Sequence, residues 1–83
     1  MFAVAFEKRA EKEFLKLDPE TRKLIAAKIL DLQKGNFRGD KALQGKHKGK
    51  FRKRAGNYRI IYYKEGQLLL ITIIRIAHRR EVY

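Results

Sequence analysis

A chain of 83 residues forms one domain with a small core, which excludes a cofactor fold combined with a deep substrate cavity. Its 45% hydrophobic residues argue against disorder, and the absence of cysteine excludes disulfides, thiolate zinc sites and cysteine nucleophiles. Lysine and arginine outnumber aspartate and glutamate by 21 to 9, so the single domain, residues 1–83, is expected to bind a polyanion.

The N-terminal segment predicts a strand followed by a helix. Residues 2–6, FAVAF, form a short β-prone apolar run. Ala10, Phe14 and Leu17 then recur at helical spacing, which places them on one stripe of a helix over residues 8–17.

A second helix is expected directly after the first. Asp18 supplies an N-cap oxygen, and Pro19 suits the first helical position, where its missing N–H costs nothing. The apolar stripe continues to residue 34, and Gly35 is a typical C-cap. The short connection predicts an antiparallel αα hairpin that lies on a sheet.

The second half of the chain predicts a loop and a β-meander. Residues 36–49 are polar and punctuated by glycine, which is typical of a loop. Three β-type segments follow, KFRKR, YRIIYYK and LLLITIIRIA, joined by tight turns at Gly56-Asn57 and Glu65-Gly66. The last segment is apolar on both alternations, so it should be an interior strand beside the N-terminal strand.

The expected fold is therefore α+β, in the order β-α-α-β-β-β. It consists of a small four-stranded, largely antiparallel sheet with the N-terminal αα hairpin packed on one face. The apolar runs are much shorter than the roughly 18 residues that cross a bilayer, and no basic segment precedes the first. We expect neither a membrane span nor a signal peptide, and a cytoplasmic location.

The positive charge is concentrated in the second half. Residues 1–40 carry a net charge of +2 and residues 41–83 a net charge of +10, with nine basic residues and no acid from Lys41 to Lys64. Nucleic acid is the favoured partner. An anionic membrane surface would call for a basic amphipathic helix, which the glycines and β-type residues disfavour, and a basic face that only aids solubility is the remaining alternative.

The hairpin register predicts a cationic face. If Gly56-Asn57 is a two-residue loop, Arg54 pairs with Arg59, because antiparallel partners keep a constant index sum. Lys50, Arg52, Arg54 and Arg59 then share one face. Opposed like charges destabilise a sheet, so an absent anion is the better explanation for them. A three-residue loop would put Arg59 on the other face.

Conventional active sites are disfavoured. The only histidines are His47 and His78, each among cations, so we expect no metal site, and there is no dinucleotide or Walker motif, so we expect no cofactor. The chain has no serine. Lysine, arginine, histidine and tyrosine remain. Side chains of these types can cleave RNA without a metal, because the RNA 2′-OH supplies the nucleophile and the cations stabilise the phosphorane. Non-catalytic RNA-binding sheets use the same side chains.

Three motifs carry a family resemblance. They are LQG at residues 43–45, GNYRIIY at residues 56–62 and HRREVY at residues 78–83. With the N-terminal strand and helical hairpin, the whole chain resembles the RelE/ParE superfamily of type II toxin–antitoxin toxins, and its RelE-like branch in particular. That resemblance implies an endoribonuclease, an mRNA interferase that cuts mRNA in the ribosomal A site and inhibits translation. It implies 2′-OH attack, giving 2′,3′-cyclic phosphate and 5′-OH ends.

The resemblance also implies catalytic residues. Lys50 matches a lysine thought to act as base, and Arg52 stands where a second lysine is common, although an arginine clamps phosphate and does not act as a base. Arg59 matches the phosphate-binding arginine. Arg79 matches the arginine implicated in leaving-group protonation or transition-state stabilisation, and Tyr83 matches the tyrosine that stacks on the mRNA base.

Partners follow from the charge and the resemblance. Lys46, Lys48 and Arg54 are expected to bind RNA phosphates of mRNA or the ribosome. A cognate acidic antitoxin, RelB-like and partly disordered, would cover the cationic face in a toxin–antitoxin hetero-oligomer.

Other interpretations remain open. A ParE-like DNA gyrase inhibitor uses the same fold, and a non-catalytic RNA-binding module is a third possibility. Lys50, Arg52 and Arg54 could serve for docking alone, and Arg59 could be structural. His78 is either a general acid or, more in keeping with its alternation, a packed strand-end residue. The tyrosines at positions 58, 62 and 63 are expected to pack on the sheet.

Overall fold

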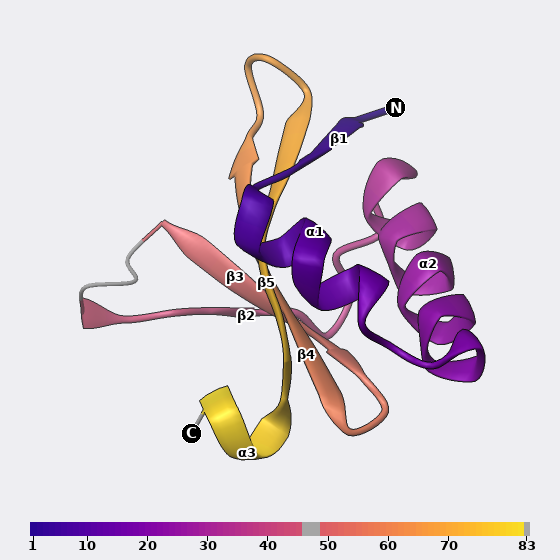
Figure 1. The fold of residues 1–83 in the computed structure, drawn as a ribbon. Coiled ribbons are helices and arrows are strands. Elements are labelled where there is room, and N and C mark those ends of the chain that lie inside the picture. The colour runs from indigo at the N-terminus through magenta and orange to yellow at the C-terminus, as the bar shows by residue number, and fades with distance from the viewer. Residues whose placement is uncertain (46–48, 83) are drawn as a thin grey trace.

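A mixed five-stranded sheet in the order β1-β5-β4-β3-β2 organises the chain (Figure 1). The computed structural model describes residues 1–45 and 49–82. The elements are β1 (Ala3–Phe6), α1 (Lys8–Leu15), α2 (Pro19–Gln33), β2 (Lys41–Ala42), β3 (Lys50–Ala55), β4 (Tyr58–Glu65), β5 (Leu70–His78) and α3 (Arg79–Val82). The α+β class is confirmed.

The predicted number of strands was wrong. The four expected strands are present, and a fifth, β2, pairs antiparallel with β3 through Lys41 opposite Arg52 and Ala42 opposite Phe51. β2 lies within the segment that was expected to be a loop. A strand of two residues is too short to show an alternating pattern, so no local signal predicted it. β1 lies beside β5 as expected, and this pair is parallel, so the sheet is mixed.

Both helices expected from the N-terminal half form. The Asp18 carboxylate caps α2 by accepting from the Thr21 N–H at 3.3 Å and from the Thr21 hydroxyl at 2.6 Å. These bonds, the hydroxyl's first, hold the pKa of Asp18 below its ordinary value. Gly35, with φ of 80°, follows the helix in the left-handed conformation predicted for a C-cap.

The two helices lie against the sheet, and α3 stands apart from them at the end of β5 (Figure 1). α1 packs on β5, and α2 packs on β3 and β1. The core between them is formed by apolar residues of α2, β4 and β5, and its largest fully buried side chains are Tyr62, Ile25, Leu32, Ile60, Ile71 and Ile73. Among the described residues, no helix has the length and apolarity needed to cross a membrane.

The two hairpins differ in how well the sequence predicted them. Ala55 pairs with Tyr58, so the two-residue turn at positions 56 and 57 is confirmed, and Gly56 takes a φ of 60° as the first turn residue. The tight turn expected at Glu65-Gly66 was wrong. Glu65 pairs with Leu70, which leaves a four-residue loop. Its two leucines extend the apolar run of the following strand, and this made the loop look like part of it.

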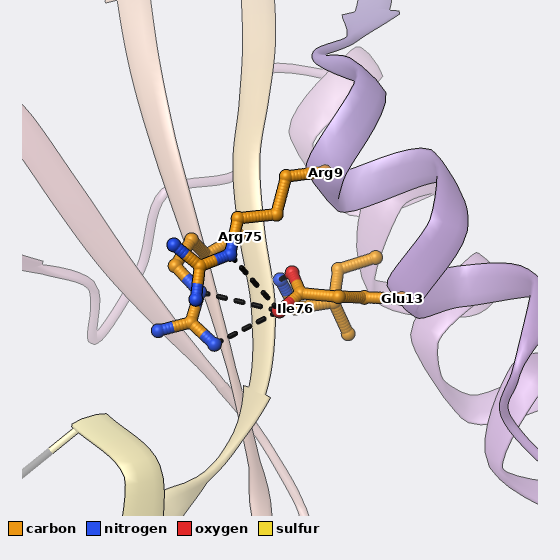
Figure 2. A network of polar contacts seen from close by, with 4 residues as sticks. All are labelled: Arg9, Glu13, Arg75 and Ile76. Carbon is orange, nitrogen blue, oxygen red and sulfur yellow. Dashed lines mark hydrogen bonds and ion pairs between the residues drawn. The ribbon is translucent and has the colours of Figure 1, made fainter.

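Glu13 of α1 completes the edge of β5 where β1 ends (Figure 2). The parallel pairing stops at Ile73, whose carbonyl accepts from the Glu7 N–H at 2.9 Å before the chain turns into α1. Farther along β5, the Glu13 carboxylate accepts from the Ile76 N–H at 2.8 Å and from the Arg75 guanidinium at 2.8 and 3.2 Å. Beyond the end of β1, the Glu13 side chain thus accepts the hydrogen bond that a continuing strand would accept from β5, and it fastens α1 to the sheet.

A buried polar cluster fastens the segment before β2 to the helix-covered face. Asp40 accepts from Lys53 Nζ at 3.0 Å and from the Tyr62 hydroxyl at 2.5 Å, and its side chain is 4% exposed. Phe37 and Phe51 stack on the Tyr62 ring with centroids 6.2 and 5.7 Å away. Charge, hydrogen bonds and aromatic packing therefore hold residues 37–41 in place.

Removal of Asp40 is expected to be strongly destabilising. In Asp40→Ala the Lys53 ammonium stays buried without its partner, so the free energy of unfolding should fall by about 3–5 kcal/mol. Urea denaturation measures this change. Glu11→Ala, at an exposed position of α1, is the control and should change the value by about 0.5 kcal/mol at most. Equal effects in the two variants would contradict the structural role of Asp40.

Tyr62 should make stability depend on alkaline pH. Burial and the neighbouring Asp40 carboxylate, in that order of importance, raise the pKa of the Tyr62 phenol far above its ordinary value. Above about pH 10, the unfolded chain loses the phenol proton, whereas the folded chain keeps it. The contribution of Tyr62 to the free energy of unfolding is therefore complete below that pH and declines above it. At pH 8 the free energy of unfolding of the wild type should exceed that of Tyr62→Phe by about 1–3 kcal/mol. Urea denaturation at pH 8 and pH 11 should show the difference narrowing, and a constant difference would contradict this assignment.

Candidate nucleic-acid interface

The strand register gathers cations on the face of the sheet opposite the core. Arg54 lies directly across from Arg59, as the two-residue turn predicted. Since side chains alternate along a strand, Lys50, Arg52 and Arg54 of β3 share that face with Arg59 of β4. The predicted cationic face is therefore confirmed by the pairing. Lys53 points the other way, toward Asp40.

Cations line an open pocket on this face. Its volume is about 260 Å³, and its walls are Gly39, Lys41, Arg52, Arg54 and Arg59. The four charged residues come from three adjacent strands, β2, β3 and β4, and none of the lining residues that the structure describes is acidic. Such a concentration of positive charge in a concave surface suits a phosphate group.

Arg59 is the most buried of these cations. The residue is 9% exposed, and its Nη1 donates to the Gly56 carbonyl at 3.2 Å and to the Tyr58 carbonyl at 2.9 Å. These bonds tie the guanidinium to the β3–β4 turn. The structural role considered for Arg59 is thus present, and Arg59 lines the pocket as well.

Arg79 approaches the same turn from the C-terminal side. Its backbone N–H donates to the Asn57 carbonyl at 2.8 Å, and its side chain is exposed at the start of α3. Arg59 and Arg79 therefore both contact the turn that joins β3 to β4. Two residues that are 20 positions apart in sequence thus contact the same turn, Arg59 through its side chain and Arg79 through its backbone.

Lys50 lies at the other end of β3. It is opposite Tyr63, and its Cα is four residues of β3, about 13 Å, from that of Arg54. It does not line the pocket. The backbones of Lys50 and Arg79 thus lie near opposite ends of β3, and their long side chains must extend toward the pocket between them to reach one phosphate.

Sequence reasoning missed two residues on this face. Lys41 was counted in the basic run, but its position in the pocket depends on β2, which the sequence did not predict. Tyr63 was grouped with the packed tyrosines, yet it is 39% exposed and lies opposite Lys50. The alternation of β4 carried that signal, because Tyr62 and Tyr63 must point to opposite faces.

His78 belongs to the core side of the sheet. It pairs with Tyr58 across β4 and β5, and the two rings meet edge to face with centroids 5.4 Å apart. Its Nδ1 accepts from the Arg80 N–H at 3.3 Å. The packed strand-end interpretation of His78 is confirmed, and His78 does not line the pocket.

Three predicted site residues, Lys46, Lys48 and Tyr83, lie outside the described residues, as does His47. Across residues 1–45 and 49–82, no group of three or more His, Asp or Glu side chains is placed to hold a metal ion. The donors that line the pocket are all cationic, which suits an anion and repels a metal cation.

Comparison with known proteins identifies one family. The model of the ParE toxin of type II toxin–antitoxin systems, parDE, matches residues 4–83. Toxin RelG of Mycobacterium tuberculosis is 29% identical over 86 residues, which cover 99% of this chain and 95% of RelG.

Two solved toxin–antitoxin complexes have the same fold. The RelBE2 complex of M. tuberculosis contains a chain that is 28% identical, with a TM-score of 0.72 and coverage of 94% of this chain and 98% of that one. The RelB–RelE complex of Methanococcus jannaschii contains a chain that is 29% identical, with a TM-score of 0.74 and coverage of 95% and 94%. The family match spans almost the whole chain and the fold agrees over the same length, so this chain belongs to the ParE toxin family of type II toxin–antitoxin systems, within the RelE/ParE superfamily.

Proposed function

We propose that this toxin is a metal-independent endoribonuclease that cleaves mRNA, in the ribosomal A site, and so inhibits translation in the cytoplasm. The observation that carries the proposal is the pocket on the open face, where four of the described residues, Lys41, Arg52, Arg54 and Arg59, bring positive charge together. RNA cleavage by its own 2′-OH passes through a phosphorane with additional negative charge, and preorganised cations stabilise that charge. The resemblance to the RelE branch supports the same reaction.

Each proposed catalytic residue has a distinct role in this reaction. Arg59 holds a phosphate oxygen near the scissile bond, since its guanidinium is fixed by two backbone carbonyls. Arg52 clamps phosphate beside it. Lys50 removes the 2′ proton as the 2′-oxygen bonds to phosphorus. Arg79 stabilises the 5′-oxygen, which takes a proton from water as its bond to phosphorus breaks, and Tyr83 stacks on a base. The products are a 2′,3′-cyclic phosphate and a 5′-OH.

The mRNA backbone runs along β3 in this proposal. Arg52 and Arg54 are two residues apart, about 7 Å along the strand, and Lys50 extends the same row. Exposed Tyr63 beside Lys50 offers a surface for stacking. Lys46 and Lys48 precede this row in sequence and add charge for RNA docking.

The antitoxin is the proposed protein partner. The related chains of M. tuberculosis and M. jannaschii were solved in complex with antitoxins. With a net charge of +12, this chain favours an acidic partner, RelB-like, that neutralises the cationic face in a hetero-oligomer. A short acidic reading frame beside this gene is expected.

Gyrase inhibition is the second candidate, because the matching family model describes ParE toxins. An experiment in cells distinguishes mRNA cleavage from gyrase inhibition. After induced expression, the 5′ ends of mRNA should show discrete cuts within translated codons. Intact mRNA together with a DNA-damage response would overturn the nuclease proposal and favour gyrase.

Cleavage should depend on Lys50 and Arg79. Lys50→Ala or Arg79→Ala should each lower the single-turnover rate on ribosome-bound mRNA by about 10²-fold or more, because each removes an acid–base or electrostatic group. Ribosome binding should barely change, and the rate should be unaffected by EDTA once ribosome integrity is controlled.

The matched control is Lys23→Ala, which removes one exposed charge from α2 on the core side of the sheet. It should keep the wild-type rate. Lys53→Ala is not a suitable control, because Lys53 is buried in its ion pair with Asp40. Wild-type rates in the Lys50 and Arg79 variants, or 5′-phosphate products, would show that the mechanism is wrong.

Binding to RNA should weaken steeply with salt. If the row on β3 contacts single-stranded RNA, log K should fall with log salt by about 0.7 for each phosphate neutralised. Fluorescence anisotropy with a short labelled RNA measures the slope. A slope near zero would exclude the cationic face as a polyanion site.

A further inference from the structure

The pocket contains one cation that the proposed reaction does not use. Lys41 lies on the edge strand β2, opposite Arg52, and it lines the same pocket as Arg54 and Arg59. Its side chain is exposed and makes no hydrogen bond or ion pair with a described residue, unlike Lys53 on the opposite face. Lys41 is therefore available to a ligand in the pocket.

The four cations form two cross-strand pairs. Lys41 faces Arg52 across β2 and β3, and Arg54 faces Arg59 across β3 and β4. Directly opposed residues of antiparallel strands share a face and have Cβ atoms about 5 Å apart. The two pairs are displaced by two residues of β3, about 7 Å. This displacement is close to the spacing of consecutive phosphates in an extended RNA strand.

The acidic neighbour of Lys41 does not cancel its charge. Asp40 points to the helix-covered face, where Lys53 and Tyr62 bind both of its carboxylate oxygens. The same bonds fix the backbone one residue before Lys41, and the Gly39 backbone forms part of the pocket wall. The buried cluster thus fixes the backbone beside Lys41 and pairs the Asp40 charge with Lys53 on the opposite face.

We propose that Lys41 is a phosphate-binding residue, and that Lys41 and Arg52 together bind the phosphate next to the one held by Arg54 and Arg59. This inference rests on the proposed function, because it specifies how the pocket holds an RNA backbone. It assigns a role to β2, which otherwise only extends the sheet.

The test is binding of a short fluorescein-labelled single-stranded RNA by anisotropy over a range of NaCl concentrations. Lys41→Ala should weaken binding at low salt and reduce the slope of log K against log salt by about 0.7 to 1. Lys41→Arg should keep the wild-type slope, and Lys23→Ala on α2 is the matched control that should also keep it. Thermal unfolding of every variant verifies the fold.

Double variants test the shared phosphate. Lys41→Ala and Arg52→Ala should be non-additive in log K, because both act on one phosphate, whereas Lys41→Ala and Arg54→Ala should be additive. Additivity in the first pair would overturn the shared phosphate.

The outcomes separate this inference from the proposed function. A wild-type slope in Lys41→Ala, with steep salt dependence in the wild type, would overturn the role of Lys41 alone. Absence of RNA binding by the wild type would overturn both proposals.

Discussion

The two-residue turn between β3 and β4 is the constraint on which the cationic face depends. A strand has a side-chain period of two, so one more residue in the turn would move every side chain of β4 to the opposite face. Arg59 would leave the pocket, and Tyr62 would leave the core. The register is therefore specified twice, by Gly56 in the turn and by the apolar residues of β4 that face the helices.

Several parts of the chain hold this turn. Leu24 of α2 lies so close that a Cβ at Gly56 would be 3.1 Å from its side chain, and Gly56 has a φ of 60°. Arg59 donates to the Gly56 carbonyl, and Arg79 donates to the Asn57 carbonyl. The same contacts that stabilise the turn hold the Arg59 side chain at one end of the open face and the Arg79 backbone beside it, so folding and site formation are coupled there.

The sequence predicted what depends on local rules and failed where the determinant is distant. The helix caps and the Gly56 turn carry strong local preferences, and the alternation of β3 and β4 then predicts the face of each cation. Strand β2 forms because Asp40, the residue before it, binds Lys53 and Tyr62, which lie 13 and 22 positions later in the chain. These bonds hold the segment against the sheet. No local pattern reports such contacts, and Lys41 was missed as a pocket residue for the same reason.

The pocket combines rigid and adaptable cations. Arg59 is buried and held by two carbonyls, so in the proposed function it would lose little side-chain freedom on binding a phosphate and would fix where that phosphate lies. Lys41 and Arg54 are exposed, and they supply charge that adjusts to the ligand. Directly opposed like charges, such as Arg54 and Arg59, repel each other, and a polyanion bound on this face would reduce that repulsion. An acidic antitoxin and an RNA strand would relieve the same repulsion, and they would therefore compete for the face.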